Sequence, residues 1–164
     1  MTTYIKEKLS DVVKTAQIHQ QRLEDAYQKI MSWGSLNKDL YFTLSIEQIA
    51  LTDQYVYRFA KLQDLMGDKL FKLILEYVGE DTEKLAFIDV LNKLEKLEII
   101  ESAATWLNLR LDRNKIAHDY VKNIEEILED LCALINKKEV LNNQLHSCLN
   151  YLKNKGFDTI MLTD

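Results

Sequence analysis

Residues 2–30, TTYIKEKLSDVVKTAQIHQQRLEDAYQKI, carry the pattern that decides the fold. Apolar side chains return every three or four positions along this stretch, and they include Ile5, Leu9, Val12, Val13, Ala16, Leu23, Ala26, Tyr27 and Ile30. This spacing places them on one face of an α-helix, which has about 3.6 residues per turn. The stretch therefore predicts a long amphipathic helix that begins near Thr2 or Thr3 and stops near Gly34.

Similar spacing continues through most of the chain. Residues 39–66 predict a second helical stretch that Gly67 bends or interrupts, and the pattern resumes up to Gly79. The other helices are expected to begin near Asp81 or Thr82, near Ser102 and near Asn123, and the last of them is expected to be long and to reach Gly156. We expect these elements to pack as an all-α, antiparallel bundle of four to five helices.

The composition favours the same fold class. The chain of 164 residues has no proline and only 4 glycines, whereas 47% of its residues are hydrophobic. A β-sandwich or barrel needs more turn residues than this, and a disordered chain has fewer hydrophobic ones. One domain over residues 1–164 is expected at this length.

Charge and cysteine usage limit the function classes further. The net charge of −5 excludes a protein coated with basic residues, but it leaves room for a local cationic site. We find no apolar leader and no run of 18 apolar residues, so no membrane partner is expected. Cys132 and Cys148 form no CxxC or Cys/His pair, so we expect reduced core cysteines in a cytoplasmic protein without metal or cofactor. His19 and His146 are assigned no role.

One segment, residues 110–122 (RLDRNKIAHDYVK), departs from the amphipathic pattern. It holds four cationic side chains against two acidic ones in an otherwise acidic chain. Arg113 can grip a phosphate with its planar guanidinium, and His118, with an ordinary pKa of about 6.5, can exchange a proton near neutrality. RNA cleavage without metal needs a base for the 2′-OH, an acid for the 5′-oxygen and a cation for the phosphorane. The segment contains the residue types for this chemistry.

Helix geometry restricts this interpretation. Arg113 and His118 are five positions apart and would point about 140° away from each other on an unbroken helix. Either the helix ends near His118, or two copies of the segment meet. A two-fold dimer would also provide a second histidine, and therefore both an acid and a base. We expect a homodimer with this segment at its interface.

The run Arg113-Asn114-Lys115-Ile116-Ala117-His118 resembles the R-x(4–6)-H signature of HEPN domains (higher eukaryotes and prokaryotes nucleotide-binding). These domains are all-α bundles, and many are metal-independent RNases. With Tyr120 included, the pattern R-x4-H-x-Y is similar to that of HepT-like toxins, which are encoded beside a minimal nucleotidyltransferase antitoxin. The resemblance implies that Arg113 and His118 are catalytic, and that the antitoxin adds AMP to Tyr120 and thereby silences the RNase.

The same resemblance suggests supporting residues and partners. Asn114 matches the polar residue that often follows the arginine, and Arg110 and Lys115 are candidates for contacts with the RNA substrate, which could be a tRNA. Residues 53–59, DQYVYRF, are similar to a D-x(3–4)-R-F stretch in nucleotidyltransferase-associated members of the family. The expected partners are a second copy of the chain, the cognate nucleotidyltransferase and RNA.

Other interpretations stay open at this point. The chain could be a non-catalytic subunit that holds a nucleotide or substrate for a nucleotidyltransferase, or a helical scaffold whose motif is accidental. In these cases Arg113 could form a surface ion pair with Asp112 or Asp119, His118 could cap or support a helix junction, and Tyr120 could be a core aromatic.

Overall fold

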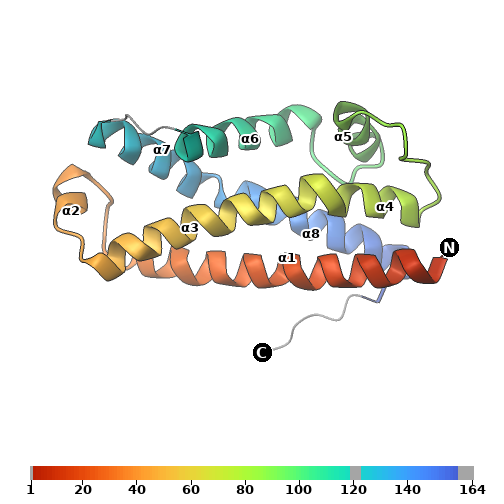
Figure 1. The fold of residues 1–164 in the computed structure, drawn as a ribbon, viewed down its shortest axis with the longest axis horizontal. Coiled ribbons are helices and arrows are strands. Elements are labelled where there is room, and N and C mark those ends of the chain that lie inside the picture. The colour runs from red at the N-terminus through yellow and green to blue at the C-terminus, as the bar shows by residue number, and fades with distance from the viewer. Residues whose placement is uncertain (1, 119–122, 159–164) are drawn as a thin grey trace.

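The computed structural model describes residues 2–118 and 123–158, and these form helices and no strand, which confirms the all-α class. In chain order the elements are α1 (Thr2–Met31), α2 (Lys38–Phe42), α3 (Ile46–Leu65), the π-helical turn η1 (Met66–Leu70), α4 (Phe71–Tyr77), α5 (Phe87–Lys96), α6 (Ala103–His118), α7 (Ile124–Asn136) and α8 (Lys138–Asn154). Helices α1, α3 and α6 run antiparallel in turn, and α7 and α8 return along them (Figure 1). The helical bundle expected from the apolar spacing is therefore present.

The predicted helix over residues 39–66 is wrong in one respect, because it divides into α2 and α3. Ser45 begins α3 with a capping box: its hydroxyl accepts from the Gln48 amide at 3.2 Å, and the Gln48 side chain accepts from the Ser45 amide at 2.8 Å. This exchange satisfies amide groups that have no partner inside the helix, and it stabilises a helix start at this point.

The predicted interruption at Gly67 is confirmed. Gly67 lies in η1, where it is buried. It sits against Trp106 and Phe87, and a Cβ atom added to it would lie 3.5 Å from Trp106 Cζ2. The following helix, α4, gives way to a turn at Gly79, whose φ of +90° suits a residue without a side chain. Residues 46–77 thus form one nearly continuous helical rod with a wider turn in its middle.

Helix α5 begins later than the sequence indicates, at Phe87 instead of Asp81 or Thr82. The Thr82 hydroxyl donates to Glu76 Oε1 at 2.6 Å, and Asp81 Oδ1 accepts from the Glu83 amide at 3.0 Å. Thr82 and Asp81 therefore make their side-chain hydrogen bonds within the loop before α5, and these bonds compete with helix formation.

The predicted single last helix is also wrong, because it divides into α7 and α8 at Lys137. Its start is correct: Asn123 Oδ1 accepts from the Glu126 amide at 2.9 Å. Helix α7 packs on α6, whereas α8 is tied to α1 by a hydrogen bond between Gln20 and Asn142 at 3.3 Å. Two different partners require two helix directions, and the bend between α7 and α8 is visible in Figure 1.

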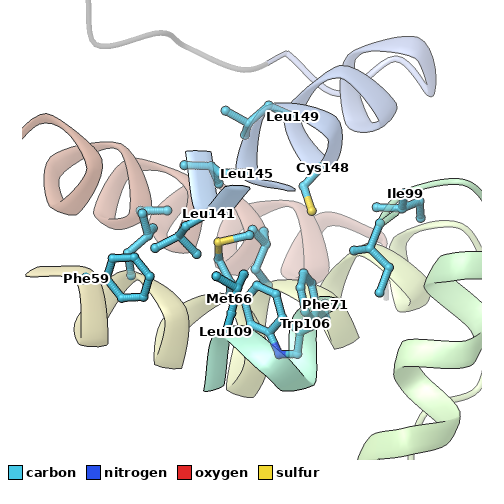
Figure 2. Packing of buried hydrophobic residues seen from close by; sticks show 14 of the residues in the cluster. Phe59, Met66, Phe71, Ile99, Trp106, Leu109, Leu141, Leu145, Cys148 and Leu149 are labelled. Carbon is cyan, nitrogen blue, oxygen red and sulfur yellow. The ribbon is translucent and has the colours of Figure 1, made fainter. Parts of the chain in front are cut away.

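The core lies where α1, α3, η1, α4, α6 and α8 meet. Figure 2 shows Trp106 and Phe71 close together beneath Cys148 of α8, and their ring centroids are 4.6 Å apart in an edge-to-face arrangement. Both cysteines are free: Cys148 is fully buried, which raises the pKa of its thiol to about 12, and Cys132 is half-buried. The prediction of a core thiol is confirmed for Cys148 and only partly for Cys132.

Candidate functional site

The segment singled out in the sequence forms the last turns of α6. Ser102 starts this helix as predicted, because its hydroxyl accepts from the Thr105 amide at 3.0 Å, and the helix ends at His118. Helix α6 is unbroken from Arg113 to His118, so within one chain the two positions point about 140° apart, and of the two geometries considered only a meeting of two copies would bring them together. The structure describes His118 through its backbone, and Tyr120 lies outside the described residues.

Arg113 is held in the seam between α6 and α3. Its Nε donates to Gln63 Oε1 at 3.3 Å, and one terminal nitrogen forms an ion pair with Asp64. Its side chain is only 15% exposed. The described partner is thus Asp64 from another helix, and not the Asp112 that the sequence suggests. A guanidinium has five N–H donors, so those not bound to α3 remain to meet a phosphate.

Arg110 shares this side of α6 with Arg113. Its guanidinium carbon lies 5.3 Å from the centre of the Phe87 ring, and it lines a narrow cleft together with Arg113, Asp64 and Asp68. The volume open to solvent there is about 10 Å³, which is about the space of one water molecule. A substrate must therefore approach these two arginines from the surface.

Asn114 and Lys115 lie on a different side of α6. Both line an open hollow with Leu111 and Lys137, away from the cleft of Arg113. The Lys115 ammonium lies 3.4 Å from the Asp112 carboxylate. Position 118 comes seven residues after Leu111, so helical periodicity places it on the same face as Leu111. The structure brings Arg110 and Arg113 together and separates them from Asn114 and Lys115.

Another cavity, of about 460 Å³, borders the end of α6. Ile116 lines it from α6, and Asp53, Val56 and Tyr57 line it from α3. The Tyr57 ring is 52% exposed. Sequence reasoning did not identify this cavity, although it lies within the stretch 53–59 that was quoted for its family resemblance. Asp53 and Tyr57 are exposed, whereas Tyr55 and Phe59 are buried. This alternation is the signal that one face of α3 is exposed.

Two further findings concern metals and membranes. Within residues 2–118 and 123–158, no three His, Cys, Asp or Glu side chains gather in a way that could hold a metal ion. Among the helices of the same residues, none combines the length and the apolar character needed to cross a membrane.

Comparisons of the chain with protein-family models, with curated proteins and with solved structures found no match.

Proposed function

We propose that this chain is a metal-independent endoribonuclease of the HEPN type, and that it acts as a cytoplasmic toxin. The observation that carries the proposal is the R-N-x3-H sequence in the last turns of α6, whose Arg113 guanidinium is held by Asp64 and Gln63. A fixed cation near a helix end can stabilise the charge that develops on a phosphorane, because it needs little reorganisation.

The proposed reaction is a transesterification within the RNA, in which the phosphorus exchanges its 5′-oxygen for the neighbouring 2′-oxygen. The 2′-oxygen attacks phosphorus after a base removes its proton, and the bond to the 5′-oxygen breaks as an acid protonates that oxygen. The products are a 2′,3′-cyclic phosphate and a 5′-hydroxyl. His118 carries a proton in this scheme, and Arg113 stabilises the pentacoordinate phosphorus.

A homodimer would supply the second proton carrier. Leu111 supports this proposal, because it is 59% exposed on the α6 face that also contains position 118. Two such faces that meet across a two-fold axis would bring both His118 residues to one cleft. We expect Leu111→Glu to yield monomers in sedimentation experiments. The control Ile88→Glu, at an exposed position on α5, should leave the oligomeric state unchanged.

The proposed control of the toxin is covalent. A cognate nucleotidyltransferase would add AMP to Tyr120, two positions beyond His118. The added phosphate would place negative charge where the RNA phosphate has to bind. Mass spectrometry of the chain co-expressed with that enzyme tests this: a mass increase by AMP units that Tyr120→Phe abolishes is the expected result, and an unchanged mass contradicts it.

The decisive experiment measures RNA cleavage in EDTA. We expect His118→Ala to lower the rate by a factor on the order of 10² or more, and to relieve growth arrest when the chain is expressed. His146→Ala is the matched control, because His146 is exposed on α8. Equal rates for the wild type and His118→Ala would overturn the proposal.

A second function is favoured by one observation: Arg113 lies on a different side of α6 from Leu111, whose face contains position 118, so within one chain the two residues do not share a phosphate. In that case the chain is a non-catalytic subunit that binds nucleotide phosphates for a nucleotidyltransferase. It would then bind a nucleotide in an Arg113-dependent manner, without growth arrest and without RNA cleavage.

A further inference from the structure

Helices α1 and α3 share a group of basic side chains, which we call the α1–α3 basic cluster: His19, Arg22, Arg58 and Lys61. Within the described residues, neither Arg22, Arg58 nor Lys61 forms an ion pair with a carboxylate. The nearby Asp64, three positions after Lys61, is engaged by Arg113. An uncompensated positive group of this kind is notable in a chain with a net charge of −5.

His19 ties the cluster together across the two helices. Its Nδ1 lies 3.0 Å from a terminal nitrogen of Arg58, and a guanidinium can only donate, so Nδ1 accepts. Burial lowers the pKa of His19, and the charges of Arg58, Arg22 and Lys61 lower it further. The ring is therefore neutral at pH 7, and its proton is left on Nε2. His19, which the sequence left without a role, holds Arg58 in place.

Arg58 is costly to the folded state in this arrangement. Its Nε is buried and has no hydrogen-bond partner in the described structure. Arg58 also shares the surroundings of His19 with two other cations, Arg22 and Lys61. Unpaired buried donors and like charges lower stability, and such arrangements are concentrated at sites that bind a ligand. An anion is the ligand that would compensate this charge.

Tyr57 connects the cluster with the cavity at the end of α6. The centre of its ring lies 5.2 Å from the Arg58 guanidinium carbon and 5.6 Å from Lys61 Nζ. The same half-exposed ring lines the 460 Å³ cavity that Ile116 of α6 also borders. Cations that hold phosphates next to an exposed aromatic ring that stacks a base are the combination that binds single-stranded nucleic acid.

We propose that the α1–α3 basic cluster binds backbone phosphates of a single-stranded RNA, one of whose bases stacks on Tyr57. The RNA would cross α3 from the basic cluster to the cavity at the end of α6. This inference rests on the proposed function for the identity of the nucleic acid, since it describes where the RNA extends beyond the cleaved bond. An acidic protein segment is the competing occupant, and the aromatic ring between cations and cavity favours RNA over it.

The test measures binding of a fluorescent single-stranded RNA of about twelve nucleotides with 2′-O-methyl groups. This probe lacks the 2′-hydroxyl nucleophile, so binding is read independently of cleavage. The main variant is the double substitution Arg22→Gln and Lys61→Gln, because both residues are exposed. The matched control is the double substitution Lys6→Gln and Lys153→Gln, which removes the same charge from exposed positions elsewhere on α1 and α8.

We expect the Arg22 and Lys61 variant to bind the RNA at least tenfold more weakly than the control variant. The slope of log Kd against log salt concentration should fall by about 1.4, the value for two phosphate contacts on a single strand. Tyr57→Leu should weaken binding about tenfold with an unchanged salt slope, because it removes stacking and no charge.

Two results would overturn the inference. One is an affinity and salt slope of the Arg22 and Lys61 variant equal to those of the control. The other is competition by poly-glutamate as strong as that by RNA, together with wild-type RNA affinity in Tyr57→Leu, which would indicate a surface for acidic proteins. If His118→Ala cleaves RNA as fast as the wild type while the Arg22, Lys61 and Tyr57 substitutions still weaken RNA binding, only the proposed function would be overturned.

Discussion

The guanidinium of Arg113 is ion-paired with the carboxylate of Asp64, which joins the end of α6 to the end of α3. The pair has two opposite effects on a phosphate that approaches Arg113. Asp64 helps to orient the guanidinium, and its negative charge repels the phosphate. The two effects can be separated, because an amide in the place of the carboxylate still accepts a hydrogen bond.

We therefore expect Asp64→Asn to strengthen RNA binding, with KM for cleavage lower by roughly threefold. Orientation of Arg113 would be kept by the amide oxygen and by Gln63. The control is Asp68→Asn, an exposed carboxylate at the same cleft for which no contact with Arg113 is found in the described residues. A folded Asp64→Asn variant that no longer cleaves RNA would contradict this expectation.

A second prediction concerns Lys138, a buried lysine at the start of α8. Its ammonium forms ion pairs with Glu24 of α1 and with Glu139, and it lies 4.0 Å from the centre of the Tyr27 ring. Lys138→Met leaves Glu24 without its charged partner, so we expect a loss of about 2 kcal/mol in the free energy of unfolding. Urea unfolding measures this loss, and the neighbouring Lys137→Met, for which no ion pair is described, should cost much less.

A third prediction concerns stability below about pH 6.5. The pKa of His19 is lowered from 6.5 by burial and by the charges of Arg58, Arg22 and Lys61. As the pH falls below 6.5, the unfolded chain takes up a proton at His19 before the folded chain does. The free energy of unfolding therefore decreases as the pH falls below about 6.5. Above that pH, His19 does not affect it.

The matched variant is His19→Gln, whose amide oxygen can still accept from Arg58. We expect it to flatten the pH dependence of urea unfolding just below pH 6.5, whereas His146→Gln should leave it unchanged. Glu24, Glu47 and Glu125 also have lowered pKa values, but these carboxylates act only below about pH 4.5. Equal pH profiles for the wild type and His19→Gln would contradict the assignment.

Much of the fold could be predicted because its signals are local. The apolar spacing of residues 2–30 predicts α1 with its start at Thr2 and an end three residues later than Met31, and the caps Ser102, Asn123 and Gly79 act as their residue types indicate. The break at Lys137 has no such signal, because Leu134 and Leu141 continue the apolar spacing across it. The break before α3 did have one, since Ser45 and Gln48 have the spacing of a capping box.

The candidate site could be predicted only in part, for a different reason. Residues 113 and 118 are recognisable together because they are close in the sequence. Arg113 and Asp64 are 49 positions apart, and His19 and Arg58 are 39 apart. Helical periodicity shows which side of a helix is polar, but not which polar side meets which. The ion pair in which Asp64 compensates the charge of Arg113 depends on how α3 and α6 pack.

A last prediction tests the role of Gly67 in the π-helical turn beside Arg110 and Arg113. A Cβ atom at this position would lie 3.5 Å from Trp106 Cζ2 and 3.7 Å from Phe87 Cζ, which are ordinary packing distances. Gly67→Ala should therefore be accommodated, and it should raise the free energy of unfolding by up to about 1 kcal/mol, because alanine loses less backbone entropy in a helix. Gly67→Leu adds atoms where the Trp106 ring already lies, and we expect a loss of about 2 kcal/mol. Thermal unfolding of both variants tests the expected gain in stability for Gly67→Ala and the expected loss for Gly67→Leu. A destabilised Gly67→Ala would show that the turn itself requires glycine.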